Sequence, residues 1–268
     1  MSIFIQVFTR RQNFSERGMS RIFFISDAHL GLKGKKEERK QEKLLLDFLE
    51  YAEKKGDSLY IVGDLFDFWF EYRSVIPRRY LPVLFALKKL VTRGLKVRYV
   101  TGNHDFWMEN FFEDELGIKV YRGPLQTRID GKRFYVAHGD GLAKKDVGYR
   151  MLKKVLHHPM NIRLYQLLHP DVGLAIAGFF SRLSRNHRET KNRDAEYIRF
   201  ARNRFNEGFD GVVLAHTHRP QEFRENGRTY INIGDWMHHF TYGKFEKGRL
   251  SLKYWVKEKK TGSSSRNI

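Results

Sequence analysis

Residues 20–31 read SRIFFISDAHLG, a stretch in which an apolar strand is followed at once by metal-type ligands. The IFFI run at residues 22–25 is apolar throughout, which is typical of a strand covered on both faces. Asp27 and His29 come directly after it, so a carboxylate and an imidazole stand at the carboxyl end of the strand. Open α/β sheets bind their ligands at that end. The stretch therefore predicts both a sheet-based fold and the place of its functional site.

Four more stretches repeat this arrangement along the chain. Apolar runs at residues 59–62, 97–101, 134–137 and 212–215 are each followed by polar groups, namely GDLFD at 63–67, GNHD at 102–105, HGD at 138–140 and HTH at 216–218. The first four groups follow one another at intervals of about 35 to 40 residues, which is enough for one strand–helix–strand unit. One such tripeptide carries little weight, but five groups in order, each after a strand, predict one shared site.

The residue types in these groups indicate two metal ions. Hard oxygens come from Asp27, Asp64 and Asn103, and imidazole nitrogens come from His29, His138, His216 and His218. The chain has no cysteine, so thiolate sites for zinc or iron–sulfur clusters are excluded. A mixed set of oxygen and nitrogen ligands suits manganese, iron or magnesium better than a closed zinc site. Seven ligands are too many for one ion with an open position, but they suit two bridged ions that hydrolyse a phosphate ester.

Taken together, the five groups resemble the calcineurin-like metallophosphoesterase superfamily, and the resemblance covers most of residues 21–256. It implies two ligand sets that share Asp64: Asp27, His29, Asp64 and His218 for one ion, and Asp64, Asn103, His138 and His216 for the other. It also implies that His104 contacts the substrate phosphate or protonates the leaving group, with Asp105 orienting His104. Asp67 and Asp140 have two open interpretations, a similar supporting role or strand-end capping.

The remaining pattern predicts a layered α/β fold. Helices are expected at residues 36–55, 77–92 and 107–116, strands near Val120 and Thr127, and closing strands near Tyr230, Phe245 and Lys253. Strands that alternate with helices and then close the sheet favour a layered architecture, and the resemblance makes this an αββα sandwich. Gly234-Asp235 is interpreted as a turn.

Composition restricts the domain organisation and the partners. At 268 residues the chain suits one large domain, and the absence of cysteine is compatible with a reducing cytosol. The formal net charge of +19 attracts a polyanion, either nucleic acid or an anionic membrane. No segment has the roughly 20 apolar residues that span a bilayer. Residues 1–18 lack a continuous apolar h-region and do not form a secretory signal. Residues 1–20 are expected to be an unstructured leader, with an overlong start as the alternative, and residues 257–268 a flexible tail.

The interval between the fourth and fifth groups is about twice the others and holds an insertion at residues 144–193. It carries eleven Lys and Arg against three Asp and Glu, together with many aliphatic residues, and Pro159 and Pro170 divide it into short helices. Short basic amphipathic helices are typical of an interfacial membrane element. The alternatives are a helical subdomain packed on the main sheet, or a nucleic-acid surface. Aromatic residues for base stacking are sparse, which favours acyl chains.

Several stretches resemble one branch of the superfamily, the UDP-2,3-diacylglucosamine diphosphatases of lipid A biosynthesis. They are SDAHLG at 26–31, GDLFDFW at 63–69, HGDGL at 138–142 and HTHRP at 216–220. The resemblance implies that water attacks the α-phosphate, that UMP and a diacylglucosamine 1-phosphate are released, and that two Mn²⁺ ions assist. It also implies a helical lid over the acyl chains and a peripheral location on the cytoplasmic face of the inner membrane, with no nucleic acid as partner.

Some parts of this resemblance are less specific. Substrate contacts are expected from Asn103, His104, Asp146, Tyr149, Ser184 and Lys191, although Ser184 and Lys191 also fit an exposed helix face. Many members of the branch have Arg where this chain has His104, so GNHD supports phosphoester hydrolysis more than the lipid substrate. Alternatives are a nuclease or another phosphodiesterase of the superfamily, and a non-catalytic scaffold. The sequence predicts no oligomeric state.

Overall fold

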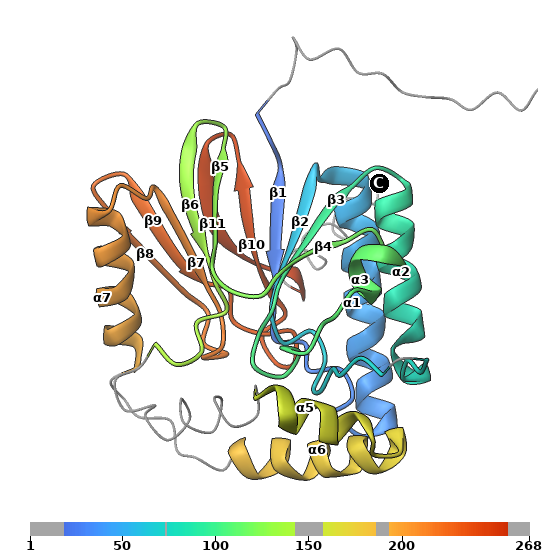
Figure 1. Ribbon diagram of the computed structural model, residues 1–268. Coiled ribbons are helices and arrows are strands. Elements are labelled where there is room, and N and C mark those ends of the chain that lie inside the picture. The colour runs from blue at the N-terminus through green and yellow to red at the C-terminus, as the bar shows by residue number, and fades with distance from the viewer. Residues whose placement is uncertain (1–18, 73, 143–157, 186–192, 257–268) are drawn as a thin grey trace, which may run out of the picture.

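The computed structural model describes residues 19–72, 74–142, 158–185 and 193–256, and it is an αββα sandwich (Figure 1). Two sheets face each other, with helices on their outer sides. The first sheet has six strands in the order β11 (Arg249–Tyr254), β10 (Thr241–Glu246), β1 (Ile22–Ile25), β2 (Ser58–Val62), β3 (Lys96–Val100) and β4 (Lys119–Tyr121). The second has five in the order β5 (Leu125–Ile129), β6 (Lys132–Val136), β7 (Gly211–Leu214), β9 (Arg228–Asn232) and β8 (Gln221–Glu225). The predicted fold class is confirmed.

The alternation of side chains along the strands produces the layers. Phe23 points outward from β1 and packs on Phe48 of α1 (Lys35–Lys55), beside α2 (Leu81–Thr92). Its neighbour Phe24 points inward and belongs to the apolar layer between the two sheets. The outer face of the second sheet packs on α7 (Arg193–Asn206) through residues such as Tyr197. Successive residues of a strand face opposite sides, so strands that are apolar at every position are buried on both faces.

Parallel pairing brings the carboxyl ends of the ligand-bearing strands to one edge. β1, β2, β3 and β4 are parallel in the first sheet, and β6, β7 and β9 are parallel in the second. Ile25 pairs with Ile61, and Val62 pairs with Val100, so the turns that follow these strands lie side by side. The polar groups after β1, β2 and β3 therefore meet those after β6 and β7 across the sandwich.

Two predicted helices need correction, and one strand was not predicted. The helix predicted at residues 107–116 is limited to α3 (Phe111–Asp114), because Trp107 bridges to Phe70 and Arg122 binds the carbonyls of Met108 and Glu109. The helix predicted at residues 77–92 begins with a separate 3₁₀ turn, η1 (Arg78–Tyr80), before α2. Strand β8 was not predicted, because this edge strand has no buried residue to mark it.

The insertion lies across the end of the sandwich to which the ligand-bearing strands run (Figure 1). Its described part forms α5 (Pro159–Gln166) and α6 (Pro170–Arg185), and each helix begins at the proline that the sequence analysis singled out. Proline fits the first turn because its missing N–H has no partner to lose there. Residues 144–157 and 186–192 of the insertion, the leader up to residue 18 and the tail lie outside the described residues. No helix in the described part of the chain is long and apolar enough to cross a membrane.

Candidate active site

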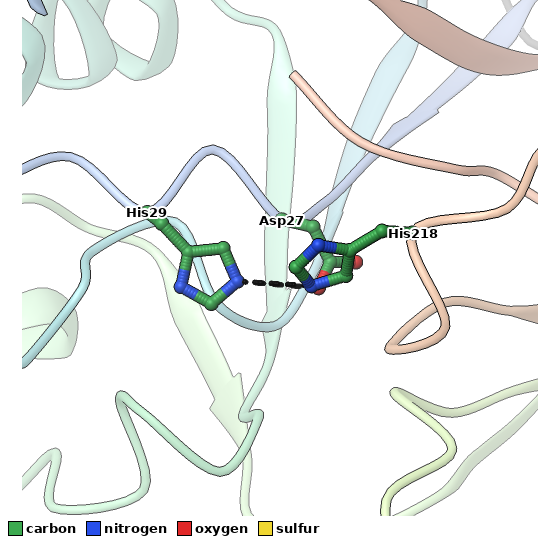
Figure 2. A group of neighbouring side chains, drawn as sticks. All are labelled: Asp27, His29 and His218. Atoms are coloured by element: carbon green, nitrogen blue, oxygen red, sulfur yellow. Dashed lines mark hydrogen bonds and ion pairs between the residues drawn. The ribbon is translucent and has the colours of Figure 1, made fainter. Parts of the chain in front are cut away.

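One group of ligands gathers Asp27, His29 and His218 (Figure 2). The Nε2 atoms of His29 and His218 are 3.2 Å apart. Asp27 Oδ1 lies 3.1 Å from His218 Nε2 and 3.6 Å from His29 Nε2. Two imidazoles and a carboxylate thus point to one spot, as the first predicted ligand set requires.

A second group lies beside it and contains Asp64, His138 and His216. His138 Nε2 is 3.1 Å from Asp64 Oδ2, 3.2 Å from His216 Nδ1 and 3.2 Å from Asn103 Oδ1. Asp64 Oδ2 is also 3.7 Å from His29 Nε2 of the first group. Asp64 therefore lies between the two groups, where a bridging carboxylate is expected.

The donor set fits cations rather than a network of hydrogen bonds. His138 Nδ1 donates to the carbonyl of Val62 at 2.9 Å, so in the neutral ring Nε2 carries the lone pair that can bind a cation. Nε2 faces the oxygens of Asp64 and Asn103, so a positive charge, either a proton on the ring or a metal ion, belongs between these atoms. Asp27 Oδ1 is buried and has no donor aligned with it, although two imidazoles lie close. Such a cluster is stable when positive ions lie between the ligands, and a mixed set of oxygen and nitrogen ligands suits Mn²⁺, Fe²⁺ or Mg²⁺.

The electrostatics of the site agree with this fit. Burial alone would raise the pKa of Asp27, but His218 and His138 hold it well below its usual value. Burial would also raise the pKa of Asp64, and the nearby His138 and His104 lower it. Burial lowers the pKa of His29, but Asp27 and Asp67 outweigh that effect and raise it to about 9. Both carboxylates are thus ionised, and the cluster attracts positive charge.

Five of the ligands have a strained backbone. The φ angles are positive at Asp27 (51°), His29 (42°), Asp64 (54°), His216 (70°) and His218 (56°). Non-glycine residues adopt this left-handed region rarely, and such strain concentrates at functional sites. Asp27, Asp64 and His216 lie two residues after the end of a strand, and His29 and His218 lie four residues after one, in the turns that carry the side chains to the shared site. Backbone bonds hold these turns together, such as His29 N to the Asp64 carbonyl at 3.0 Å.

His104 lies at the same site but is held differently from the prediction. Its Nδ1 donates to the backbone carbonyl of Asp67 at 2.7 Å, which leaves Nε2 available. Asp105 was predicted to orient His104, and this is wrong. Its carboxylate accepts from Leu65 N at 2.9 Å, from Gly102 N at 2.7 Å and from the Tyr99 hydroxyl at 2.5 Å.

Asp105 instead supports the loops that carry the ligands. Burial and the negative charge of Asp64 raise the pKa of Asp105 to about 6. Asp67 contributes its carboxylate as well, at 3.6 Å from His29 Nδ1, which favours a supporting role over strand-end capping. Burial alone would lower the pKa of His138, but Asp64 and Asp27 raise it well above its usual value, and Asp140 makes a smaller contribution in the same direction.

Comparison with known proteins identifies the family of this chain. Residues 20–220 match the family model described as calcineurin-like phosphoesterase. The chain belongs to the calcineurin-like phosphoesterase family. It is 31% identical over 255 residues to a protein named UDP-2,3-diacylglucosamine hydrolase from Porphyromonas gingivalis, with 87% of this chain and 97% of that protein covered. A protein of the same name from Nitrosococcus oceani is 31% identical over 221 residues, with 80% of this chain and 86% of that protein covered. A solved structure from Streptococcus pneumoniae TIGR4, described as a predicted phosphoesterase, aligns with a TM-score of 0.42 at 13% identity, over 90% of this chain and 92% of that chain.

The phosphoesterase also has a supporting residue that the sequence analysis interpreted only as part of a turn. Asp235 is fully buried and accepts backbone N–H groups from Met237 (2.8 Å), His238 (2.5 Å) and His239 (3.1 Å). This turn is tied to the site because the N–H of Trp236 donates to the backbone carbonyl of Asp27 at 3.1 Å. The sequence signal that could have indicated this role is an aspartate directly before a polar turn, since the side chains of such residues accept from the N–H groups that follow them.

The predicted lid contacts are only partly placed in this phosphoesterase. Asp146, Tyr149 and Lys191 lie outside the described residues. Ser184 lies near the end of α6, and its side chain is not among those that the structure describes. The substrate contacts of the lid therefore stay predictions, whereas Asn103 and His104 lie at the ligand cluster.

Proposed function

We propose that this phosphoesterase is a two-metal hydrolase that cleaves the pyrophosphate bond of UDP-2,3-diacylglucosamine. The products would be UMP and 2,3-diacylglucosamine 1-phosphate. The observation that carries the proposal is the pair of neighbouring ligand groups with Asp64 between them, in a chain that covers 97% of a relative named for this substrate. Two divalent ions, Mn²⁺ in this proposal, would activate water and neutralise charge on the phosphate.

The residues of the chain have distinct roles in this reaction. Asp27, His29, Asp64 and His218 would hold one ion, and Asp64, Asn103, His138 and His216 the other. His104 would contact the phosphate: its Nδ1 donates to the Asp67 carbonyl, so Nε2 is the atom left for the substrate, and in the imidazolium form it would carry the proton that a phosphate oxygen or the leaving group accepts. Only 14% of this side chain is exposed, so little water competes for that contact.

Removing the metal should abolish activity, and Mn²⁺ should restore it. The ligands are oxygen and nitrogen groups, which bind divalent ions reversibly, and without ions the site would lose the metal-bound water that is proposed as the nucleophile. The check is hydrolysis of a chromogenic phosphodiester by chelator-treated protein, before and after Mn²⁺ is added, with elemental analysis of each sample. Full activity in a sample shown to be metal-free would contradict the two-metal proposal.

Replacing His104 by alanine should lower turnover by about 10²- to 10³-fold, the scale for loss of one donor to transition-state charge. Metal content should stay near normal, because the side chain is proposed to face the phosphate. The measurements are kcat and elemental analysis on the same preparation. Loss of metal in His104→Ala would place this residue among the ligands instead, next to His29 and Asp64, with which it could also share an ion.

The described part of the insertion supports an acyl or membrane partner. Met160, Leu164 and Leu167 lie on α5 or directly after it, at intervals that share one helix face, and Leu167 is 83% exposed. Val172 and Ile176 continue this apolar exposure on α6. Aliphatic side chains beside basic residues are typical of an element that rests at a membrane interface. We therefore include a peripheral position on the cytoplasmic face of the membrane in the proposal.

The lid prediction separates lipid from nucleic acid as the partner. Leu164→Gln with Leu167→Gln should raise KM for the diacylated substrate at least about 10-fold, since each exposed leucine that enters lipid contributes about 1.5 kcal/mol or more. Turnover of a small chromogenic phosphodiester should not change.

Binding to liposomes with and without anionic lipid, beside binding to DNA, is the companion measurement. The net charge of +19 is the observation that favours a nuclease. DNA cleavage that is steeply salt-sensitive, without preference for the acylated substrate, would favour that second candidate.

A further inference from the structure

The segment from Asp67 to Tyr72 holds His104 through two backbone contacts. The Asp67 carbonyl accepts from His104 Nδ1 at 2.7 Å, and the N–H of Trp69 donates to the His104 carbonyl at 3.0 Å. Both the ring and the backbone of His104 are thus hydrogen-bonded to this segment. A shift of the segment would move His104 relative to the ligand cluster.

The other side of the segment is covered by the insertion. The ring of Tyr165 on α5 lies 4.6 Å from the ring of Phe70, 5.8 Å from Phe68 and 6.4 Å from Tyr72, measured between centroids. Phe68 and Phe70 are themselves stacked, with parallel rings 6.3 Å apart. Tilted and offset aromatic pairs at these distances are attractive beyond the area they bury. Tyr165 is therefore the residue through which the insertion packs against the segment.

The hairpin of α5 and α6 is closed by the same tyrosine. The Tyr165 hydroxyl donates to the carbonyl of Gly173 at 2.6 Å, so it ties the two helices together. Gly173 is buried against the segment: a Cβ there would collide with the hydroxyl oxygen of Tyr72 and lie 3.1 Å from that of Tyr165. The two helices thus dock as a unit on the residues that follow the bridging carboxylate Asp64.

We propose that Tyr165 is a positioning residue for His104. It acts through Phe68 and Phe70, which lie one and three residues after Asp67, and so fixes the Asp67 carbonyl that holds the His104 ring. This inference rests on the proposed catalytic role of His104. It differs from a role in acyl binding, because it predicts an effect on substrates that have no acyl chain. Displacing a catalytic group by about 1 Å can cost up to 10²-fold in rate.

The test is a double-mutant cycle on a small chromogenic phosphodiester, with Tyr165→Leu, His104→Ala and both together. Tyr165→Leu keeps an apolar side chain but removes the ring and the hydroxyl. It should lower kcat about 10-fold with unchanged metal content. In the His104→Ala background the same change should cost less than about 2-fold, because residues that act through one another are not additive. Tyr165→Phe, which keeps the ring contacts, should retain most of the turnover.

Tyr51→Leu is the matched control. Tyr51 is also a half-buried tyrosine with three aromatic neighbours, at 5.5 Å from Phe23, 6.2 Å from Phe48 and 5.2 Å from Trp255, and it packs on the opposite side of the first sheet from the sandwich interior. It should lower thermal stability without lowering kcat. If Tyr165→Leu does not fold, Phe70→Leu perturbs the same contact from the other side, with the same non-additive loss expected.

The outcomes separate this inference from the proposed function. Normal turnover of His104→Ala would overturn the catalytic role of His104, and this inference with it. If His104→Ala loses turnover but Tyr165→Leu has no effect, or an effect that multiplies with that of His104→Ala, this inference alone is overturned. Equal losses of kcat in Tyr51→Leu and Tyr165→Leu would likewise overturn it, because both would then reflect general destabilisation.

Discussion

Replacing Asp64 by alanine is expected to lower hydrolysis roughly 10³-fold or more, the largest loss among single ligand changes. Asp64 Oδ2 is the atom that both ligand groups approach, at 3.1 Å from His138 Nε2 and 3.7 Å from His29 Nε2. In the proposed two-metal site, its removal would take a ligand from both ions at once. The second oxygen, Oδ1, also accepts from the backbone N–H of His104 at 2.9 Å, so the loop with the proposed phosphate contact loses a support.

His29→Ala is the comparison that decides the bridging role. In the proposed ligand sets His29 holds one ion and Asp64 holds both, so the loss of His29 should weaken one ion more than the other. Both variants are compared in titrations with Mn²⁺ at matched protein concentration, with circular dichroism to show that each is folded. If Asp64→Ala retains more activity than His29→Ala across the titration, Asp64 does not bridge.

The five ligand groups could be predicted from the sequence because two simple patterns coincide there. Apolar runs such as IFFI at residues 22–25 specify strands that are buried on both faces, and hydrophilic ligands directly after them are rarely accidental. Parallel pairing then determines that the ligands meet at one edge. What the pattern does not contain is the left-handed backbone of Asp27 or His216, since aspartate and histidine adopt it only where the surrounding fold compensates.

The partner of His104 could not be predicted for a different reason. Asp105 is adjacent in sequence, but its carboxylate turns inward and accepts from Gly102, Leu65 and Tyr99. The actual partner is a backbone carbonyl, that of Asp67. Every residue has a carbonyl, so no sequence pattern marks the one that is used. Side-chain chemistry can be deduced from residue types, whereas contacts to the backbone depend on the packed turns.

Edge strand β8 was missed although the sequence holds one local signal for it. Its side chains alternate only between exposed and half-buried positions, so the period-2 apolar signal is missing. Its pairing with β9 is local, because the strands are joined by the two-residue turn Asn226-Gly227, in which both residues have a positive φ. The contact to β11, where Glu222 accepts from the N–H of Leu252 at 2.8 Å, is long-range and is not encoded in a short window of sequence.

Gly102→Ala is expected to lower activity about 10²-fold or more although it changes no ligand. A Cβ at this position would overlap Asp64 Oδ1, and it would lie 2.8 Å from the backbone nitrogen and 2.9 Å from Cγ of Asp64. Neither the backbone of Gly102 nor that of Asp64 can shift easily. Val62 and Val100 are in register on adjacent strands, and the Gly102 N–H donates to Asp105 at 2.7 Å.

The carboxylate of Asp64 should therefore rotate out of its position between the two ligand groups in Gly102→Ala, and Mn²⁺ content measured by elemental analysis should fall together with turnover. Gly123→Ala is the control, because a Cβ there meets nothing within 4 Å and should leave both quantities unchanged. A Gly102→Ala protein with normal metal content and normal turnover would show that the site tolerates displacement of Asp64. That result would argue against the shared carboxylate as the centre of the reaction, because the predicted loss depends on a steric overlap with that one side chain.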